Sequence, residues 1–266
     1  MSLVAITRSP GPELARCELT HLERQAIDVG RALVQHRAYQ DSLRRAGIEV
    51  VELASDPGLP DGAFVEDTAV VLDELAVITS PAPPSRREEW PAIAATLSPF
   101  RRLVRCPLDA SLEGGDVLRV GRVLYVGQGG RTGTAGLTAL DALVRPLGYT
   151  VIPVRLVGCL HLKSACCALD DETLLVNRAL LEAGAFSGLR LVDVPTEEPW
   201  GANVLVLPGV TLVSAACPRT AELVCALGQP AGALDVSELH KAEAGLTCMS
   251  LVFDREGKPV GKPASR

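Results

Sequence analysis

Aromatic residues are scarce in this chain of 266 residues, of which phenylalanine, tryptophan and tyrosine together make up 3%. Few side chains can therefore stack on bases, and a net charge of -6 at pH 7 opposes binding to a polyanion. No apolar run approaches the ~18 residues of a membrane-spanning helix, and the apolar run at residues 3–7 is too short for a signal peptide. We therefore expect neither a nucleic-acid partner nor a membrane partner.

The eight cysteines include no Cys-x-x-Cys pair and no cysteine–histidine spacing that is typical of structural zinc. Reduced thiols in a cytoplasmic protein are the plain interpretation of this pattern. Hydrophobic residues make up 47% of the chain, which is enough to bury a core without disulfides or a metal. Because no linker or low-complexity tract divides the sequence, residues 1–266 are predicted to form a single domain.

A repeated pattern of strand, loop and hairpin runs along the chain. Five apolar segments are predicted as buried strands, and each is followed by a loop and a β-rich segment. The strands are residues 48–53, 102–106, 149–154, 189–194 and 233–236, and the β-rich segments are residues 68–79, 117–126, 165–176, 203–215 and 249–253. The first four β-rich segments carry central turn signals and are predicted as hairpins. The fifth lacks its second strand, which residues 3–7 are predicted to supply, so that the ring of units closes.

Helices are predicted before four of the five strands, at residues 21–46, 86–97, 135–147 and 219–227. Gly47, Gly148 and Gly228 follow three of them, where a left-handed C-terminal cap favours glycine. A weaker helix is predicted at residues 178–185, where nearby glycines lower the helical propensity. The sequence thus predicts an α/β protein built from five units of helix, strand, loop and hairpin.

Reactive side chains fall in the loops that join each strand to its hairpin. If the five units pack around an axis, these loops meet at one end of it. In chain order they carry Asp61, Glu66 and Asp67, then Glu113 and Asp116, then His161, then Trp200 and Asn203, and finally Cys248. Together they offer a nucleophile, a base and several acids. Taken singly, each has a simpler interpretation as a buried cysteine, a satisfied loop histidine or a solvated turn acid.

Other features admit more than one interpretation. The glycine-rich residues 127–134 lack the Gly-Lys-Ser/Thr ending of a phosphate-binding loop, so we interpret them as the start of a helix and expect no cofactor. Arg86 and Arg131 suit a substrate carboxylate, although each taken alone is more simply a surface charge. A zinc site made by Cys248, His161 and an acid is a third interpretation, but no close ligand pair anchors it and we expect no metal.

Six short motifs, in order and spanning nearly the whole chain, resemble those of the dimethylarginine dimethylaminohydrolase family. They are Phe64-Val65-Glu66-Asp67, Ser85-Arg86-Arg87, Glu113-Gly114-Gly115-Asp116, Arg131-Thr132, His161-Leu162-Lys163 and Cys248-Met249-Ser250. The resemblance implies the fold of the guanidine-modifying pentein superfamily, a fivefold pseudosymmetric α/β propeller. This fold agrees with the five-unit repeat in the sequence.

The resemblance also implies a reaction and a set of site residues. Cys248 would attack the guanidinium carbon of a methylated arginine, dimethylamine or methylamine would leave, and water would resolve a covalent thiouronium intermediate to citrulline. His161 would shuttle the protons and Glu113 would hold it. The implied substrate contacts are Glu66 and Asp67 at the guanidinium end, Arg86 and Arg131 at the carboxylate, and Leu19, Asp61 and Ala242. Residues 242–247 depart from the Asp-Gly that the family commonly has before the nucleophile.

Two other functions remain open at this point. An arginine deiminase of the same superfamily would use the same residues on unmethylated arginine, but such enzymes are typically longer. A non-catalytic binding protein for a cationic amino acid would need neither Cys248 nor His161. The sequence does not fix the oligomeric state, and a homodimer is one arrangement that it allows.

Overall fold

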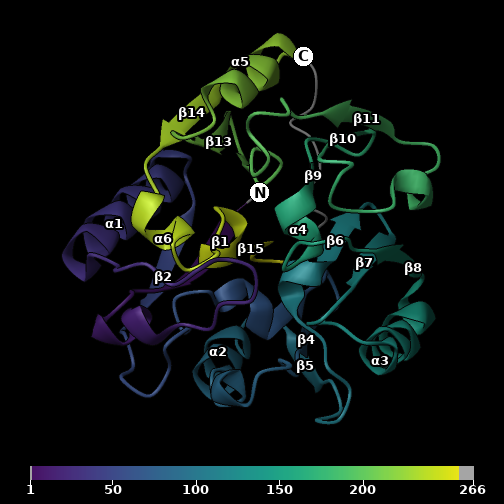
Figure 1. Cartoon of the computed structure of the whole chain (residues 1–266). Helices are drawn as coiled ribbons and strands as arrows, with labels where there is room; N and C mark the ends of the chain where they lie inside the picture. The colour runs from purple at the N-terminus through teal and green to yellow at the C-terminus, as the bar shows by residue number, and fades with distance from the viewer. Residues whose placement is uncertain (1, 258–266) are drawn as a thin grey trace.

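Five three-stranded sheets surround a central axis in the computed structural model, which describes residues 2–257 (Figure 1). In four sheets an antiparallel hairpin pairs with a parallel third strand. In the fifth sheet, β15 and β1, which are far apart in the sequence, take the place of the hairpin. The sheets are β3 Ala69–Val71, β4 Leu75–Ile78 and β5 Arg102–Arg105; β6 Val117–Val120, β7 Val123–Gln128 and β8 Thr150–Arg155; β9 Cys166–Ala168, β10 Thr173–Val176 and β11 Arg190–Asp193; β12 Leu205–Leu207, β13 Val210–Ser214 and β14 Ala231–Leu234; and β15 Leu251–Asp254, β1 Leu3–Arg8 and β2 Glu49–Leu53.

The middle strands of the first and fifth sheets are fully buried, unlike the strands that pair parallel with them. All residues of β1 and β4 are buried, whereas β2 and β5 at the sheet edges are exposed or half-buried throughout. A strand that is covered on both faces has a continuous apolar sequence, as in Leu75-Ala76-Val77-Ile78. Apolar clusters lie between neighbouring sheets, and one of them joins Leu75 of β4 to Leu124 of β7 and Leu140 of the helix outside them. The core is thus distributed around the ring.

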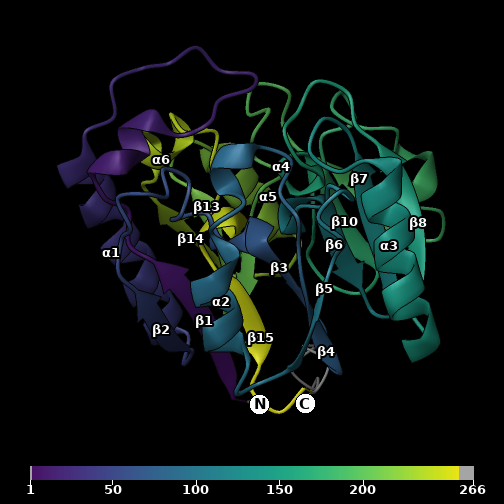
Figure 2. The same ribbon diagram turned by 90° about the horizontal axis from the view of Figure 1, so that it is seen from below.

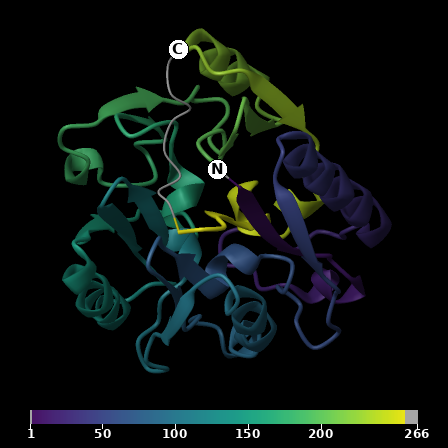
Figure 3. The same ribbon diagram turned by 180° about the vertical axis from the view of Figure 1, so that it is seen from behind.

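The N-terminal strand completes the ring of sheets, as the sequence predicts. β1 pairs antiparallel with β15, with Leu3 opposite Asp254, and parallel with β2, with Val4 opposite Glu49. Figure 3 shows the purple start of the chain beside its yellow C-terminal strand. The five sheets in the described part of the chain stay separate and are not joined into one hydrogen-bonded barrel. The predicted fivefold α/β propeller is confirmed.

Each predicted strand and the hairpin that follows it lie in neighbouring sheets. β2, for example, belongs to the fifth sheet with β1, whereas the next hairpin, β3 and β4, belongs to the first. The intervening loop therefore passes from one sheet to the next at one end of the ring. Figure 2 shows α4 and α6 at this end, opposite the N-terminus, with the purple segment between β1 and α1 arching over them.

Four predicted helices are present on the outside of the ring, with shifted bounds: α1 Val29–Arg45, α2 Trp90–Leu97, α3 Thr134–Val144 and α5 Pro218–Ala226. The prediction that the first begins at residue 21 is wrong by eight residues. Asp28 is its N-cap, and its carboxylate accepts a hydrogen bond from the Arg31 backbone N–H at 3.0 Å. Gly47, Gly148 and Gly228 have φ of 79°, 82° and 85°, which confirms the predicted left-handed caps.

The weak helix predicted at residues 178–185 is wrong, because only a 3-10 turn, Ala183–Ala185, forms there. Two single-turn helices were not predicted: α4 Leu162–Ala165 and α6 Ser237–His240. Both lie near the centre of the ring in Figure 1. No helix in the described residues combines the length and the apolarity that crossing a membrane requires.

Candidate active site

Four short segments that carry the predicted reactive residues contact one another at the centre of the ring. They are the 3-10 turns Val65–Thr68, Gly114–Asp116 and Thr247–Met249, together with α4. Glu66 and Asp67 lie in the first, Glu113 precedes the second, Cys248 lies in the third, and His161 precedes α4. All five side chains are buried. Loops that are distant in the sequence thus form one cluster.

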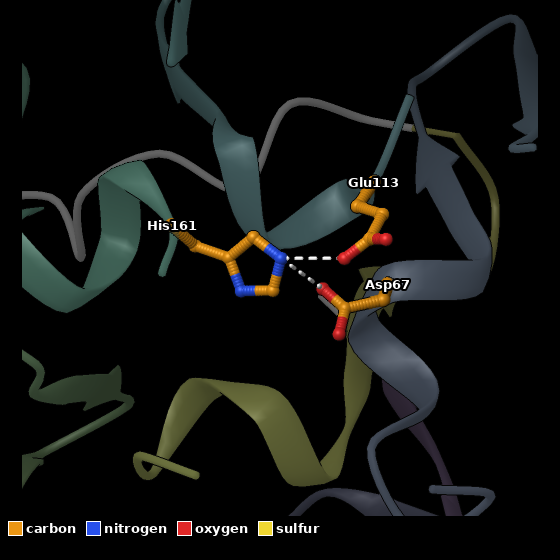
Figure 4. A group of neighbouring side chains, drawn as sticks. All are labelled: Asp67, Glu113 and His161. Atoms are coloured by element: carbon orange, nitrogen blue, oxygen red, sulfur yellow. Dashed lines mark hydrogen bonds and ion pairs between the residues drawn. The ribbon is translucent and has the colours of Figure 1, made fainter. Parts of the chain in front are cut away.

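The His161 imidazole lies between two carboxylates. Its Nε2 is 2.6 Å from Oε2 of Glu113 and 3.7 Å from Oδ1 of Asp67 (Figure 4). Burial by itself lowers the pKa of an imidazole, but Asp67 and Glu113 outweigh it and raise the pKa of His161 to about 9. His161 is therefore protonated at neutral pH and donates a charge-assisted hydrogen bond to Glu113.

Backbone groups hold this histidine in place. The Leu162 N–H, at the start of α4, donates to Oδ1 of Asp116 at 3.0 Å. The Gly115 N–H donates to Oδ1 of Asp67, also at 3.0 Å. A Cβ on Gly115 would lie 2.6 Å from that oxygen and 2.8 Å from Nδ1 of His161, so only glycine fits here. The Glu-Gly-Gly-Asp motif therefore leaves space for the imidazole and supplies two of the carboxylates around it.

Arg86 balances the buried negative charge. Its Nη1 is 2.7 Å from Oδ2 of Asp67, and its Nε and Nη2 donate to the two oxygens of Glu89 at 2.9 Å each. Although burial alone raises the pKa of Asp67, His161 and Arg86 lower it to about 2. A further hydrogen bond to the Phe64 carbonyl leaves one of the five guanidinium N–H groups of Arg86 for another partner.

Arg131 has fewer partners than Arg86. Its Nη2 donates to the Thr20 hydroxyl at 3.1 Å, and its Nη1 is 3.5 Å from Oε1 of Glu113. It therefore reaches from the imidazole–carboxylate cluster to the segment that covers the site. That both arginines bind a substrate carboxylate stays a prediction, and Arg131 has more free donors for it in this structure.

Cys248 lies beside the same carboxylates. Its sulfur accepts a hydrogen bond from the Gly245 N–H at 3.3 Å, and its side chain is only 8% exposed. Burial, followed by the negative charges of Glu66 and Asp67, raises the pKa of the Cys248 thiol well above its ordinary value. Asp67 thus influences both the thiol and the imidazole. A positively charged guest between them would favour the thiolate.

Glu66 belongs to a separate network. One carboxylate oxygen is 2.7 Å from Nζ of Lys163, and the other accepts a hydrogen bond from the Thr247 hydroxyl at 2.8 Å. Sequence reasoning assigned no role to Lys163 or Thr247, although each stands within two residues of His161 or Cys248. The same residues line one part of a cavity of about 360 Å³ that the inner strands surround.

The remaining predicted contacts lie around the segment between β1 and α1. Asp61 is buried, and its carboxylate accepts the Glu18 backbone N–H at 3.1 Å, which fixes the backbone next to Leu19. Leu19 packs against the apolar cluster that contains Ala242 and Cys248. That Asp61, Leu19 and Ala242 contact substrate stays a prediction.

Glu243 is a site residue that sequence reasoning noted only as a departure from the family pattern. Its carboxylate accepts hydrogen bonds from the backbone N–H groups of Thr20, His21 and Leu22, so it ties the covering segment to the loop before Cys248. Its φ of 58° is rare for a residue with a side chain. Such a backbone conformation cannot be read from the local sequence.

Three atoms in the site have the chemistry of metal ligands. One atom each from Asp67, Glu113 and His161 lie within 4.8 Å of one another. This set differs from the cysteine-containing set that the sequence suggested for zinc. Asp67 is already paired with Arg86, and Glu113 with His161, so a metal would have to displace both pairs. The absence of a metal from the reaction stays a prediction.

A five-sheet α/β propeller with a buried thiol, an imidazolium and several carboxylates at its centre defines the pentein class of guanidine-modifying proteins. No model of a protein family matches the sequence. A protein of Streptomyces coelicolor named N(G),N(G)-dimethylarginine dimethylaminohydrolase is 39% identical over 249 residues, which cover 93% of this chain and 95% of the relative. A protein of the same name from Pseudomonas aeruginosa is 32% identical over 250 residues, which cover 93% of this chain and 98% of the relative.

A solved structure agrees with these relatives. It is the Pseudomonas aeruginosa enzyme as a cysteine-to-serine mutant complexed with citrulline, and it matches with a TM-score of 0.90 and 31% identity over 95% of this chain and 100% of the other. This chain belongs to the dimethylarginine dimethylaminohydrolase family. The resemblance found in the sequence motifs is confirmed.

Proposed function

We propose that this chain hydrolyses Nω-methylated arginine to citrulline and dimethylamine or methylamine, with Cys248 as nucleophile and His161 as acid and base. The observation that carries the proposal is that the turn holding Glu66 and Asp67 contacts the turn holding Cys248, while Asp67 lies 3.7 Å from His161. Relatives named for this activity, and the citrulline complex of one of them, support the choice of substrate.

The reaction uses charges that are already arranged in the site. The Cys248 thiolate adds to the guanidinium carbon, and the C–N bond to the methylated nitrogen breaks as His161 gives that nitrogen a proton. Water then adds to the thiouronium carbon and gives a proton to His161. The C–S bond then breaks as the hydroxyl proton passes to the departing sulfur, which releases neutral citrulline and restores the Cys248 thiol. Glu113 holds His161 at 2.6 Å and so keeps the imidazole oriented through both steps.

The thiol is expected to ionise when substrate binds. In the free protein, burial and the nearby carboxylates keep Cys248 protonated at neutral pH. A bound guanidinium cation favours the thiolate, so its presence lowers the pKa of Cys248. We expect the thiolate absorbance and the alkylation of the Cys248 peptide to titrate at lower pH with an unreactive guanidinium analogue than without it. The variant Cys248→Ser is the blank for both signals, and identical titrations would contradict substrate-dependent activation.

A side-by-side assay tests the proposed substrate. Citrulline formation should be faster from asymmetric dimethylarginine than from arginine, measured with the same enzyme preparation. Equal or faster turnover of arginine would instead favour the arginine deiminase interpretation. Binding of either amino acid with no citrulline formed would favour a non-catalytic binding protein.

The cellular setting is also proposed. All eight cysteines are free in the structure, which supports a reducing compartment such as the cytoplasm. The homodimer and the lack of nucleic-acid and membrane partners stay predictions from the sequence, as does the single domain over residues 1–266.

A further inference from the structure

We propose that Asn203 is a positioning residue that fixes the loop of Cys248 against the loop of His161. This inference rests on the proposed function, because it concerns the geometry of that reaction. Asn203 comes from the fourth loop of the ring, two residues before β12, and it is buried. Asn203 contributes no charge to the site.

One amide group contacts both catalytic loops. The Nδ2 of Asn203 donates to the Lys163 carbonyl at 2.7 Å and to the Thr247 hydroxyl at 3.1 Å, while its Oδ1 accepts the Thr247 N–H at 3.2 Å. Lys163 stands two residues after His161, and Thr247 immediately precedes Cys248. The amide therefore donates two hydrogen bonds and accepts one, whereas an ionised carboxylate has no donor and a hydroxyl has only one.

These contacts are part of a closed ring of interactions. The Thr247 hydroxyl donates a hydrogen bond to Glu66, and Glu66 forms an ion pair with the Lys163 ammonium. Because the Thr247 hydroxyl hydrogen points to Glu66, the Thr247 hydroxyl oxygen is left to accept a hydrogen bond. The Asn203 amide donates that hydrogen bond. The ring thus joins loops one, three, four and five. An acceptor at position 203 would compete with Glu66 for the same proton.

Asn203 also packs on the backbone that holds the sulfur. A Cβ at Gly245 would lie 2.4 Å from both Cγ and Oδ1 of Asn203, so the amide lies directly against this glycine. The Gly245 N–H is the group that donates to the Cys248 sulfur. Asn203 is consequently in contact with residues three positions and one position before the nucleophile. Removal of the Asn203 side chain would therefore remove contacts with both Gly245 and Thr247 in the Cys248 loop.

The chain contains a matched control. Asn177 is its only other asparagine, and its amide also bridges backbone groups, donating to the Pro199 carbonyl at 2.9 Å and accepting the Ala179 N–H at 3.0 Å. Within residues 2–257, its side-chain amide bonds only to those two groups, and its backbone N–H, which donates to the Ala165 carbonyl at 2.8 Å, is kept when the side chain is replaced. Asn177→Ala is therefore the control for Asn203→Ala, and Asn177→Asp is the control for Asn203→Asp. Each pair makes the same substitution in a different part of the fold.

The experiment measures melting temperature, kcat and KM for asymmetric dimethylarginine, and the pH dependence of Cys248 alkylation in all four variants. A misplacement of reacting groups by about 1 Å costs on the order of 10²-fold in rate, so we expect kcat to fall ~10- to 100-fold in both Asn203 variants. KM should stay within about threefold, because Asp61 and Arg131 are untouched. The Asn177 variants should keep the kcat of the unaltered enzyme.

The titration of Cys248 separates positioning from a general loss of stability. Asn203→Asp places a carboxylate beside the Cys248 loop, so its alkylation should shift to higher pH, whereas neither Asn177 variant should shift it. Retained kcat in Asn203→Ala, with a melting temperature lowered as much as in Asn177→Ala, would overturn the proposal. If Asn203→Ala does not fold, the isosteric Asn203→Asp decides by the same criteria. Absence of citrulline from the unaltered enzyme would instead refute the proposed function, while the alkylation profiles would still test the loop contact.

Discussion

Cys248→Ala is expected to lower citrulline formation from asymmetric dimethylarginine by at least ~10³-fold, because no other thiol can replace the nucleophile. The other cysteines are spread over the fold, and the exposed Cys225 lies on α5 at the outside of the ring. Cys225→Ala is therefore the matched control and should leave turnover unchanged. Both variants can be compared by steady-state citrulline release.

Trapping provides an independent measurement of the same step. Mass spectrometry of enzyme quenched during turnover should find the substrate-derived adduct on the Cys248 peptide and on no other cysteine peptide. Full activity in Cys248→Ala, or an adduct on a different peptide, would mean that the nucleophile lies elsewhere.

Arg86→Ala is expected to lower the free energy of unfolding by about 3–5 kcal/mol, because it leaves Glu89 buried without its cation and Asp67 with His161 alone. Arg145→Ala is the control, since the side chain of Arg145 is 75% exposed and its ion pair with Asp141 should contribute at most ~1 kcal/mol. Urea unfolding of both variants measures the difference.

The effect of Arg86→Ala should also depend on pH. Burial already raises the pKa of Glu89, and without the guanidinium that pKa rises further above its value in the unfolded chain, while Asp67 keeps only His161 and the Gly115 N–H to oppose the effect of burial. Such carboxyl groups destabilise the fold above those pKa values and cease to do so once they are protonated. The loss should therefore be larger at pH 7 than near pH 5. A loss below ~1 kcal/mol at pH 7 would show that the two carboxylates find other partners.

The repeat of the fold could be predicted because local patterns encode it. A strand that is buried on both faces, such as β4, must be a short apolar run, and a turn residue must follow it. Helix starts were predicted less well. The first turn of α1 depends on Asp28, and residues 20–22 before it are held by Glu243, more than 200 residues away. No local pattern contains that contact.

In the site, too, the local sequence predicted some features, whereas contacts between residues that are distant in the sequence could not be predicted. The motifs identified which side chains are reactive, and the repeat indicated that their loops meet. Partners across loops were not predictable, and the pair of Glu66 with Lys163 is one example. The pair of Arg86 with Glu89 could have been predicted from the sequence, because residues three apart on a helical turn face the same side. The energetic cost of burying this pair, and the number of Arg86 donors that it occupies, could be found only from the structure.

The strand order of the fifth sheet has a consequence for biosynthesis. β1 leaves the ribosome long before its antiparallel partner β15, because Leu3 pairs with Asp254. Until residues 251–254 have emerged, one edge of β1 has no strand to pair with and can recruit a strand from another nascent chain. The final pairing also spans nearly the whole chain, and contacts of such large sequence separation form slowly.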